Sequence, residues 1–198
     1  MSFYITTPIY YVNDVPHIGH AYTTIACDIF SRLNKLKGKD TFFLTGTDEH
    51  GQKIQKEAKK ENKDPKIFCD EISETFRSLT KKLNLTNNDF IRTTEKRHFK
   101  SVVEIWNKLV KSGDIYLDKY NGWYSISDEA FYDKDEIEDV NGKKISKVSG
   151  SAVEWVEEES YFFKLSAWGN KLLEYYKNNE KFILPNSRRN EVIKFVEK

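Results

Sequence analysis

Cysteine is scarce in this sequence. Its two cysteines, Cys27 and Cys69, stand far apart in the chain, and no Cys-x-x-Cys pair occurs. A small secreted framework held by disulfides needs a denser and more regular set of thiols. Two isolated thiols fit a reducing compartment, so the cysteine content predicts a cytoplasmic protein.

Long hydrophobic runs and an excess of one charge are also missing. The N-terminus, MSFYITTPIYYV, lacks the basic start and apolar stretch of a signal peptide, and no run approaches the length of a membrane span. Lys and Arg number 32 against 31 Asp and Glu, which gives no general electrostatic footprint for nucleic acid. Aromatic residues make up 14% of the chain, so we expect a globular protein without a membrane partner.

The first 45 residues carry the pattern of a βαβ unit. Residues 3–6 form a short β-prone run that ends before Pro8, and a second run covers residues 41–45. Between them a helix is predicted from about His17 to Gly38, because apolar residues recur every three or four positions and share one face. These positions are Ile18, Tyr22, Ile25, Ile29, Leu33 and Leu36. Two parallel strands joined by a helix predict an α/β fold.

The remainder of the chain changes character after about residue 113. Helices are predicted over residues 73–83 and 96–111, then strands of a small antiparallel sheet over 115–132 and strand-like sequence over 153–165. Residues 133–139 are predicted to be a solvated charged stretch, and Asn141-Gly142 a tight turn. Helical sequence resumes after Ser166. The predicted domains are therefore residues 1–114 and 115–198.

A pair of histidines stands where the first loop enters the first helix. His17 and His20 lie three residues apart, so both project from one side of the helix toward its start. The free N–H groups and positive dipole at a helix start form a site for phosphate, to which imidazoles can also donate. Gly19, between them, allows a base or phosphate to approach the backbone. A His-x-x-His pair also arises by chance, but its place after a strand favours the functional interpretation.

The segment His17-Ile-Gly-His20 matches the HIGH signature of class I aminoacyl-tRNA synthetases. The longer stretches Thr6–Tyr22, Phe43–Ile54, Glu159–Leu165 and Leu184–Val192 resemble methionyl-tRNA synthetases of bacteria and organelles, in the same order along the chain. The resemblance implies the amino-terminal portion of such an enzyme. It also implies the fold, which is the first half of a Rossmann-like parallel nucleotide-binding sheet with an inserted small mixed connective-peptide module.

The resemblance implies a ligase that activates methionine with ATP to methionyl-adenylate and transfers it to tRNA(Met). ATP with Mg is the implied cofactor, and the partners are methionine, ATP and, in the full-length enzyme, tRNA(Met). His17 and His20 would be the catalytic residues. ATP would be bound by residues of the signature and of the second strand, namely His17, Gly19, His20 and Gly46.

The methionine site is implied at the ends of the first two strands. Asp48 would bind the ammonium group, and Ile9 and Tyr11 would line the site. A carboxylate at the carboxyl end of a parallel strand lies beside the crevice in which ligands of such sheets bind. Each residue also has an ordinary structural explanation. Asp48 could cap a turn, Tyr11 could pack in the core, and Gly46 and Gly51 could simply make turns. The role of His50 is left open.

The sequence departs from the family pattern in two places. Ser125 and Asp128 stand where many relatives carry zinc-binding cysteines, so no structural zinc is expected. The second family signature, Lys-Met-Ser-Lys-Ser, is not found where the family would place it, so we expect weak or no activity from residues 1–198 alone. The segment Lys144–Ser149 resembles that signature, but a lysine-rich turn is the favoured explanation.

Two other functions remain as alternatives. A metal-dependent hydrolase could use His17, His20, Asp48 and His50 as ligands, since imidazoles and a carboxylate suit a catalytic zinc. A non-catalytic nucleotide-binding module would keep the fold without the chemistry.

Overall fold

The computed structural model describes residues 2–197, which form two compact units. One unit combines the chain up to Val103 with Tyr124–Val153, and the other combines Glu104–Trp123 with the chain from Glu154 onward. No helix in residues 2–197 is both long and apolar enough to cross a membrane. The domain limits predicted from the sequence, 1–114 and 115–198, stay a prediction.

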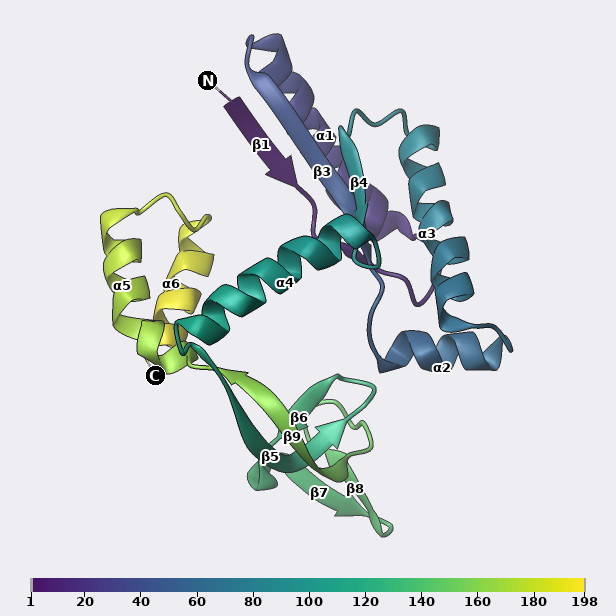
Figure 1. Ribbon diagram of the computed structural model, residues 1–198, viewed down its shortest axis with the longest axis vertical. Coiled ribbons are helices and arrows are strands. Elements are labelled where there is room, and N and C mark those ends of the chain that lie inside the picture. The colour runs from purple at the N-terminus through teal and green to yellow at the C-terminus, as the bar shows by residue number, and fades with distance from the viewer. Residues whose placement is uncertain (1, 198) are drawn as a thin grey trace. The chain divides into compact units, whose positions relative to one another are not determined.

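A parallel four-stranded sheet is the centre of the first unit (Figure 1). Its strands are β1 (Ser2–Thr6), β2 (Tyr10–Tyr11), β3 (Asp40–Asp48) and β4 (Asp89–Arg92). The strand β3 pairs in parallel with each of the other three. Helix α1 (Ile18–Leu36) connects β1 to β3, so the predicted βαβ unit and α/β fold are confirmed.

Helix α1 packs on the sheet through small and polar residues. Its buried positions are Ala21, Thr24, Asp28, Ser31 and Asn34. The apolar stripe that identifies the helix in the sequence lies on its exposed side, where Ile18 is 85% exposed and Leu36 is 87% exposed. An amphipathic helix ordinarily turns its apolar stripe to the core. Here Asp28 satisfies its buried carboxylate with the backbone N–H and hydroxyl of Thr86, at 2.7 and 2.6 Å.

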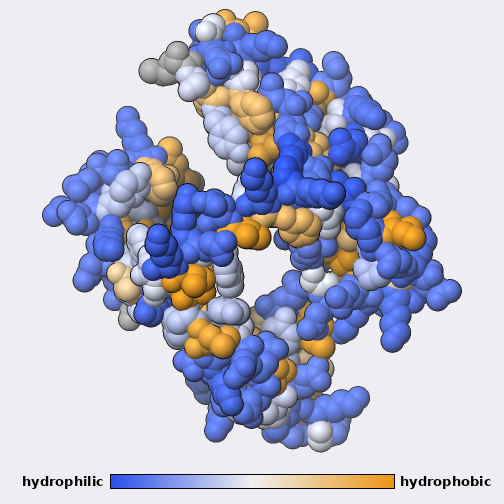
Figure 2. Space-filling view, viewed as in Figure 1, coloured by the Kyte–Doolittle hydropathy of each residue, from blue (hydrophilic) through white to orange (hydrophobic). Residues whose placement is uncertain are grey.

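The two faces of the sheet differ in burial. Phe43 of β3 is fully buried, whereas its neighbour Phe42 points to the opposite face and is 44% exposed. Phe42 stacks there on Tyr4 of β1 with ring centroids 6.1 Å apart. Figure 2 shows apolar atoms at the surface over the region of β1 and β3. The main core of the unit lies among β2 and the loop after it, the two helices that follow β3, and β4. It consists of Tyr10, Val12, Ile54, Ala58, Phe68, Cys69, Phe76 and Phe90.

Two helices follow β3 in the first unit, α2 (Gln52–Lys60) and α3 (Pro65–Lys82). The sequence prediction missed α2 and β4, and it placed the start of α3 at residue 73. The true start follows from a cap, because the Asp64 carboxylate accepts from the backbone N–H groups of Lys66 and Ile67. Pro65 at the first helical position adds to this signal. Helix α4 (Lys96–Lys111) coincides with its predicted range.

The segment 124–153 of the first unit contains a hairpin. The elements of this segment are β6 (Ala130–Tyr132), the short 3₁₀ helix η1 (Lys134–Glu136), β7 (Ile137–Val140) and β8 (Lys143–Ser146), and the last two form the hairpin. The strands β7 and β8 are antiparallel, and Asn141 and Gly142 between them both have positive φ, as a type I′ turn requires. The predicted turn is confirmed. Residues 133–139 are exposed except for the half-buried Ile137, so the predicted solvated stretch is confirmed, and residues 137–139 also pair with β8.

The second unit is built on β5 (Ile115–Ser125), whose residues up to Trp123 belong to it, and β9 (Glu154–Phe163). These strands are neighbours in one sheet and are joined by aromatic contacts such as Trp123–Trp155, with centroids 5.4 Å apart. The 3₁₀ helix η2 (Leu165–Trp168), α5 (Gly169–Asn178) and α6 (Asn186–Val196) complete it. The predicted strands and the return to helix after Ser166 are confirmed.

Candidate functional site

The two histidines of the signature cap helix α1. His17 is the N-cap residue, and its Nδ1 accepts from the backbone N–H of Gly19 at 3.1 Å. The Nδ1 of His20 accepts in turn from the backbone N–H of His17 at 3.1 Å. The two rings lie 3.8 Å apart between centroids. This reciprocal arrangement has the form of a capping box in which imidazoles replace the usual hydroxyl and carboxylate.

The cap fixes which nitrogen of each histidine is free. Because each Nδ1 accepts a hydrogen bond, the proton of a neutral ring resides on Nε2. Burial, followed by the neighbouring His17, lowers the pKa of His20 and favours this neutral form. Both rings can therefore donate from Nε2 at a helix start that already favours anions.

Gly19 has a structural role in the same cap. A side-chain carbon at this position would lie 2.9 Å from Cε1 of His17 and 3.1 Å from its Nδ1. The absence of a side chain thus lets the His17 ring fold over the helix start. The close approach of a nucleotide to the backbone at Gly19 stays a prediction.

Tyr10 joins the histidine pair to the end of the sheet. Its ring lies 4.8 Å from that of His20, and its hydroxyl is 2.7 Å from Oγ1 of Thr24 on α1. Tyr10 and Tyr11 form β2, which pairs with Thr47 and Asp48 at the carboxyl end of β3. The histidines and Asp48 are therefore linked through one short strand.

The predicted amino-acid site gathers at this end of β3. Tyr11 and Asp48 are direct partners in the β2–β3 register, and Asp48 is half-buried. Ile9, which immediately precedes β2, is 40% exposed. The arrangement leaves an anionic group beside aromatic and apolar surface, at the crevice where ligands of parallel sheets bind. The roles of Ile9, Tyr11 and Asp48 stay predictions.

Gly46 lies within the sheet. It is buried in β3 opposite Ile91 of β4, and a side-chain carbon there would lie 2.0 Å from the Ile91 carbonyl oxygen. Strand packing alone therefore requires a glycine at this position. Its predicted contact with ATP is untested.

A buried ion pair next to Asp48 was not found by sequence reasoning. The Glu49 side chain is fully buried and accepts two hydrogen bonds from Arg92, at 2.7 and 2.8 Å. It also accepts from the hydroxyls of Thr47 and Thr94, while its backbone N–H donates to Thr93 Oγ1. The hydrogen bonds from Arg92 to Glu49, together with its contact with Asp70, raise the pKa of Arg92 above its ordinary value. The network fixes the backbone directly after Asp48.

His50 lies at the exposed edge of that network. Its Nε2 is 3.4 Å from the Thr93 carbonyl oxygen, and its ring is 6.0 Å from Phe99. Its contacts are those of a surface side chain resting on the 93–99 segment.

The hydrolase alternative is not favoured by the geometry. Within residues 2–197, no group of three or more His, Cys, Asp or Glu side chains is arranged to hold a metal ion. The Nδ1 atoms of His17 and His20 are occupied by the helix cap. The four proposed ligands therefore do not form a metal site.

Hydroxyls and a carboxylate form a hydrogen-bond network around Ser125 and Asp128. Asp128 accepts from Tyr132, Ser149 and Ser151, at 2.9, 2.5 and 2.9 Å. Ser125 Oγ accepts from the backbone N–H of Asp128, and Ser146 Oγ accepts from that of Ser149. The segment Lys144–Ser149 thus belongs to this network. Lys147 donates to the Asp135 carbonyl oxygen, and Lys144 pairs with Asp139 at 3.7 Å, in agreement with a structural turn.

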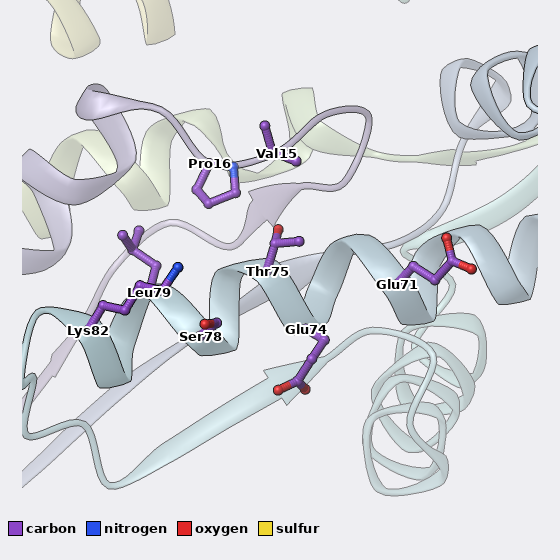
Figure 3. Close-up of a pocket in the computed structure, with 8 residues that line it drawn as sticks. All are labelled: Val15, Pro16, Glu71, Glu74, Thr75, Ser78, Leu79 and Lys82. Carbon is purple, nitrogen blue, oxygen red and sulfur yellow. The ribbon is translucent and has the colours of Figure 1, made fainter.

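A shallow pocket of about 480 Å³ lies between the loop before α1 and helix α3. Figure 3 shows Thr75 and Leu79 pointing from α3 toward Val15 and Pro16, while Glu74 points away. None of the predicted site residues lines it. The site described above, at the carboxyl end of β3, is therefore distinct from this pocket.

Comparisons with known proteins identify the family of the chain. A family model described as tRNA synthetases class I (M) matches residues 3–143. The methionine--tRNA ligase of Rickettsia bellii (strain RML369-C) is 56% identical over 195 residues, which are 98% of this chain and 38% of that protein. That of Listeria monocytogenes serovar 1/2a (strain ATCC BAA-679 / EGD-e) is 53% identical over 97% of this chain and 30% of that protein.

A solved structure is similar over nearly the whole chain. It is Mycobacterium tuberculosis methionyl-tRNA synthetase in complex with methionyl-adenylate, with a TM-score of 0.93 and 43% identity. The match covers 99% of this chain and 38% of that one. The chain therefore spans less than half the length of these relatives.

Proposed function

Because this chain belongs to the class I tRNA synthetases (M), we propose that it is the nucleotide-binding, amino-terminal part of a methionine--tRNA ligase. The observation that carries the proposal is the pair of imidazoles at the start of α1, each with Nε2 free to donate, linked through β2 to the carboxylate of Asp48. The proposal therefore puts a phosphate site and an ammonium site at the same end of one parallel sheet.

The proposed reaction is formation of methionyl-adenylate. A carboxylate oxygen of methionine bonds to the α-phosphorus of ATP, the bond from that phosphorus to the bridging oxygen breaks, and pyrophosphate leaves with the electron pair. His17 and His20 would donate from Nε2 to phosphate oxygens as negative charge redistributes. Asp48 would fix the ammonium group, so that the carboxylate faces the phosphate. The protein supplies position and charge rather than a covalent nucleophile.

The remaining parts of the proposal follow from the family. Ile9 and Tyr11 would contact the thioether side chain, and Gly19 and Gly46 would lie against the nucleotide. ATP would enter as its magnesium complex, and the methionyl group would pass to tRNA(Met) in the whole enzyme, in the cytoplasm. Since the chain spans 38% of the length of the Rickettsia bellii ligase, we expect little or no turnover from residues 1–198 alone.

Amino-acid binding tests the proposal without needing turnover. Titration calorimetry of this chain with methionine, leucine and glutamine should detect methionine with the tightest dissociation constant. Asp48→Asn should weaken methionine binding at least about tenfold, because a charge-assisted pair is lost. Asp40→Asn, at the exposed start of the same strand, should leave it unchanged. Equal binding of leucine, or no effect of Asp48→Asn, would contradict the methionine site.

Exchange of pyrophosphate into ATP tests the chemistry. The expected result for this chain is weak methionine-dependent exchange or none, and His17→Ala and His20→Ala should remove whatever exchange is present. Exchange that depends on another amino acid would overturn the methionine assignment.

A further inference from the structure

Glu129 contacts a residue of the proposed amino-acid site from a distant part of the sequence. The hydroxyl of Tyr11 donates to Glu129 Oε1 at 3.1 Å. The other carboxylate oxygen, Oε2, lies 3.7 Å from Nζ of Lys53 on α2. Glu129 directly follows Asp128, so the hydroxyl network around Asp128 fixes the turn that presents it. Tyr11 and Glu129 lie within the same compact unit.

The backbone around this contact is constrained on both sides. Gly51, the N-cap of α2, has a φ of +127°, and a side-chain carbon there would lie 2.2 Å from the Tyr11 hydroxyl oxygen. Glu129 itself adopts a φ of +53°, which is uncommon for a residue other than glycine. Strained backbone of this kind persists where the surroundings hold it and is common at ligand sites. The Tyr11 phenol is therefore held between Gly51 and Glu129.

The contact bears on the site because Tyr11 pairs with Asp48 in the β2–β3 register. Burial, and then the charge of Glu129, raise the pKa of Tyr11 to about 12. The phenol therefore stays protonated at neutral pH and remains the donor of the bond. Rotation of the Tyr11 ring would break this hydrogen bond and change the surface beside Asp48.

We propose that Glu129 is a positioning residue that holds the Tyr11 ring in the conformation required for amino-acid binding beside Asp48. This inference rests on the proposed function, since it assigns Tyr11 to the methionine site. It gives the 124–153 segment a role in ligand affinity through one hydrogen bond, without direct contact with the ligand.

The test combines the state of the ring with ligand affinity. In NMR spectra of this chain with isotope-labelled tyrosines, the ring signals of Tyr11 are identified because they are absent from the spectrum of Tyr11→Phe. Glu129→Ala should shift or broaden these signals and weaken methionine binding about tenfold, as for loss of a hydrogen bond to a charged group. Glu129→Gln keeps an acceptor oxygen and should bind methionine within about threefold of the wild type. Glu138→Ala, which removes an exposed carboxylate from β7, is the matched control and should change neither readout.

A double-mutant cycle separates positioning from general destabilisation. If Glu129 acts through the Tyr11 hydroxyl, Glu129→Ala should have no further effect on affinity in a Tyr11→Phe background. Additive effects, unchanged ring signals in Glu129→Ala, or moved signals with unchanged methionine affinity would each overturn the inference. A wild-type chain that binds no methionine would refute the proposed function, and the ring signals would then decide by themselves whether Glu129 positions Tyr11.

Discussion

Two carboxylates hold the backbone next to two residues that contact Tyr11, and they do so by different means. Glu49 follows Asp48 at the end of β3, is fully buried, and receives two hydrogen bonds from the Arg92 guanidinium. Asp128 precedes Glu129, is half-buried, and accepts from the hydroxyls of one tyrosine and two serines. One turn is therefore fixed by a buried ion pair and the other by neutral donors near solvent.

The difference shows what each environment requires. A carboxylate without access to water needs an opposite charge and a full set of donors, because desolvation of an unpaired charge is costly. A carboxylate near solvent can be stabilised by hydroxyls alone, and water can replace any of them. We therefore expect the Glu49 network to tolerate substitution poorly and the Asp128 network to tolerate it better.

Removal of the Glu49 side chain should have the largest effect. Glu49→Ala leaves Arg92 without its main partner in a buried site, and we expect a loss of about 3 kcal/mol in the free energy of unfolding. The measurement is urea denaturation followed by circular dichroism. Glu74→Ala removes a carboxylate that is 61% exposed and 3.5 Å from Arg77, and should cost less than about 0.5 kcal/mol. Equal losses in the two variants would contradict the contrast between buried and exposed pairs.

Replacement of Arg92 by lysine should have an intermediate effect. Arg92→Lys keeps the positive charge but cannot make the paired contact with Glu49 while also reaching Asp70, which Arg92 contacts at 2.5 Å. We expect a loss of about 1.5 kcal/mol, measured by the same denaturation. Arg188→Lys, at a site 69% exposed, serves as the control and should be nearly neutral. A fully stable Arg92→Lys would show that charge alone, without the fork geometry, satisfies Glu49.

Changes at Asp128 should be milder. Asp128→Ala removes the common acceptor of three hydroxyls, which water can partly replace, so its urea midpoint should fall less than that of Glu49→Ala. Asp128→Asn keeps one acceptor oxygen and should lie between Asp128→Ala and the wild type. A larger loss at Asp128 than at Glu49 would reverse the comparison.

Local patterns predicted much of the fold and part of the site. The βαβ unit, the Asn141-Gly142 turn and the position of His17 and His20 at a helix start all follow from neighbouring residues, and the structure has each of them. The apolar spacing of α1 predicted a helix but could not show which face is buried. That depends on contacts with distant parts of the chain, such as the hydrogen bonds of Thr86 to the buried Asp28.

The contacts that sequence reasoning missed join residues far apart in the chain. Glu49 pairs with Arg92, and Tyr11 bonds to Glu129, and neither pair has a periodic or local signal. An acidic residue next to Asp48 was visible in the sequence, but its burial was not. Helix α2 was missed because its nine residues are mostly charged or amide-bearing, and only Ile54 and Ala58 are buried.

Acid titration should produce the smallest effect, and it tests whether the charge of Asp128 contributes to stability. The hydroxyl of Ser149 and the other donors lower the pKa of Asp128 from 3.8 to about 2. A carboxylate with a depressed folded pKa contributes stability above its unfolded pKa, and this contribution is lost as pH falls through the folded value. The difference in urea midpoint between the wild type and Asp128→Asn should therefore be constant above about pH 4 and should narrow toward pH 2. Solvent screening at this site keeps the difference small.

Asp118→Asn, which removes an exposed carboxylate, should follow the wild type throughout. A difference that does not change with pH would mean that Asp128 contributes through the shape of its turn and not through its charge.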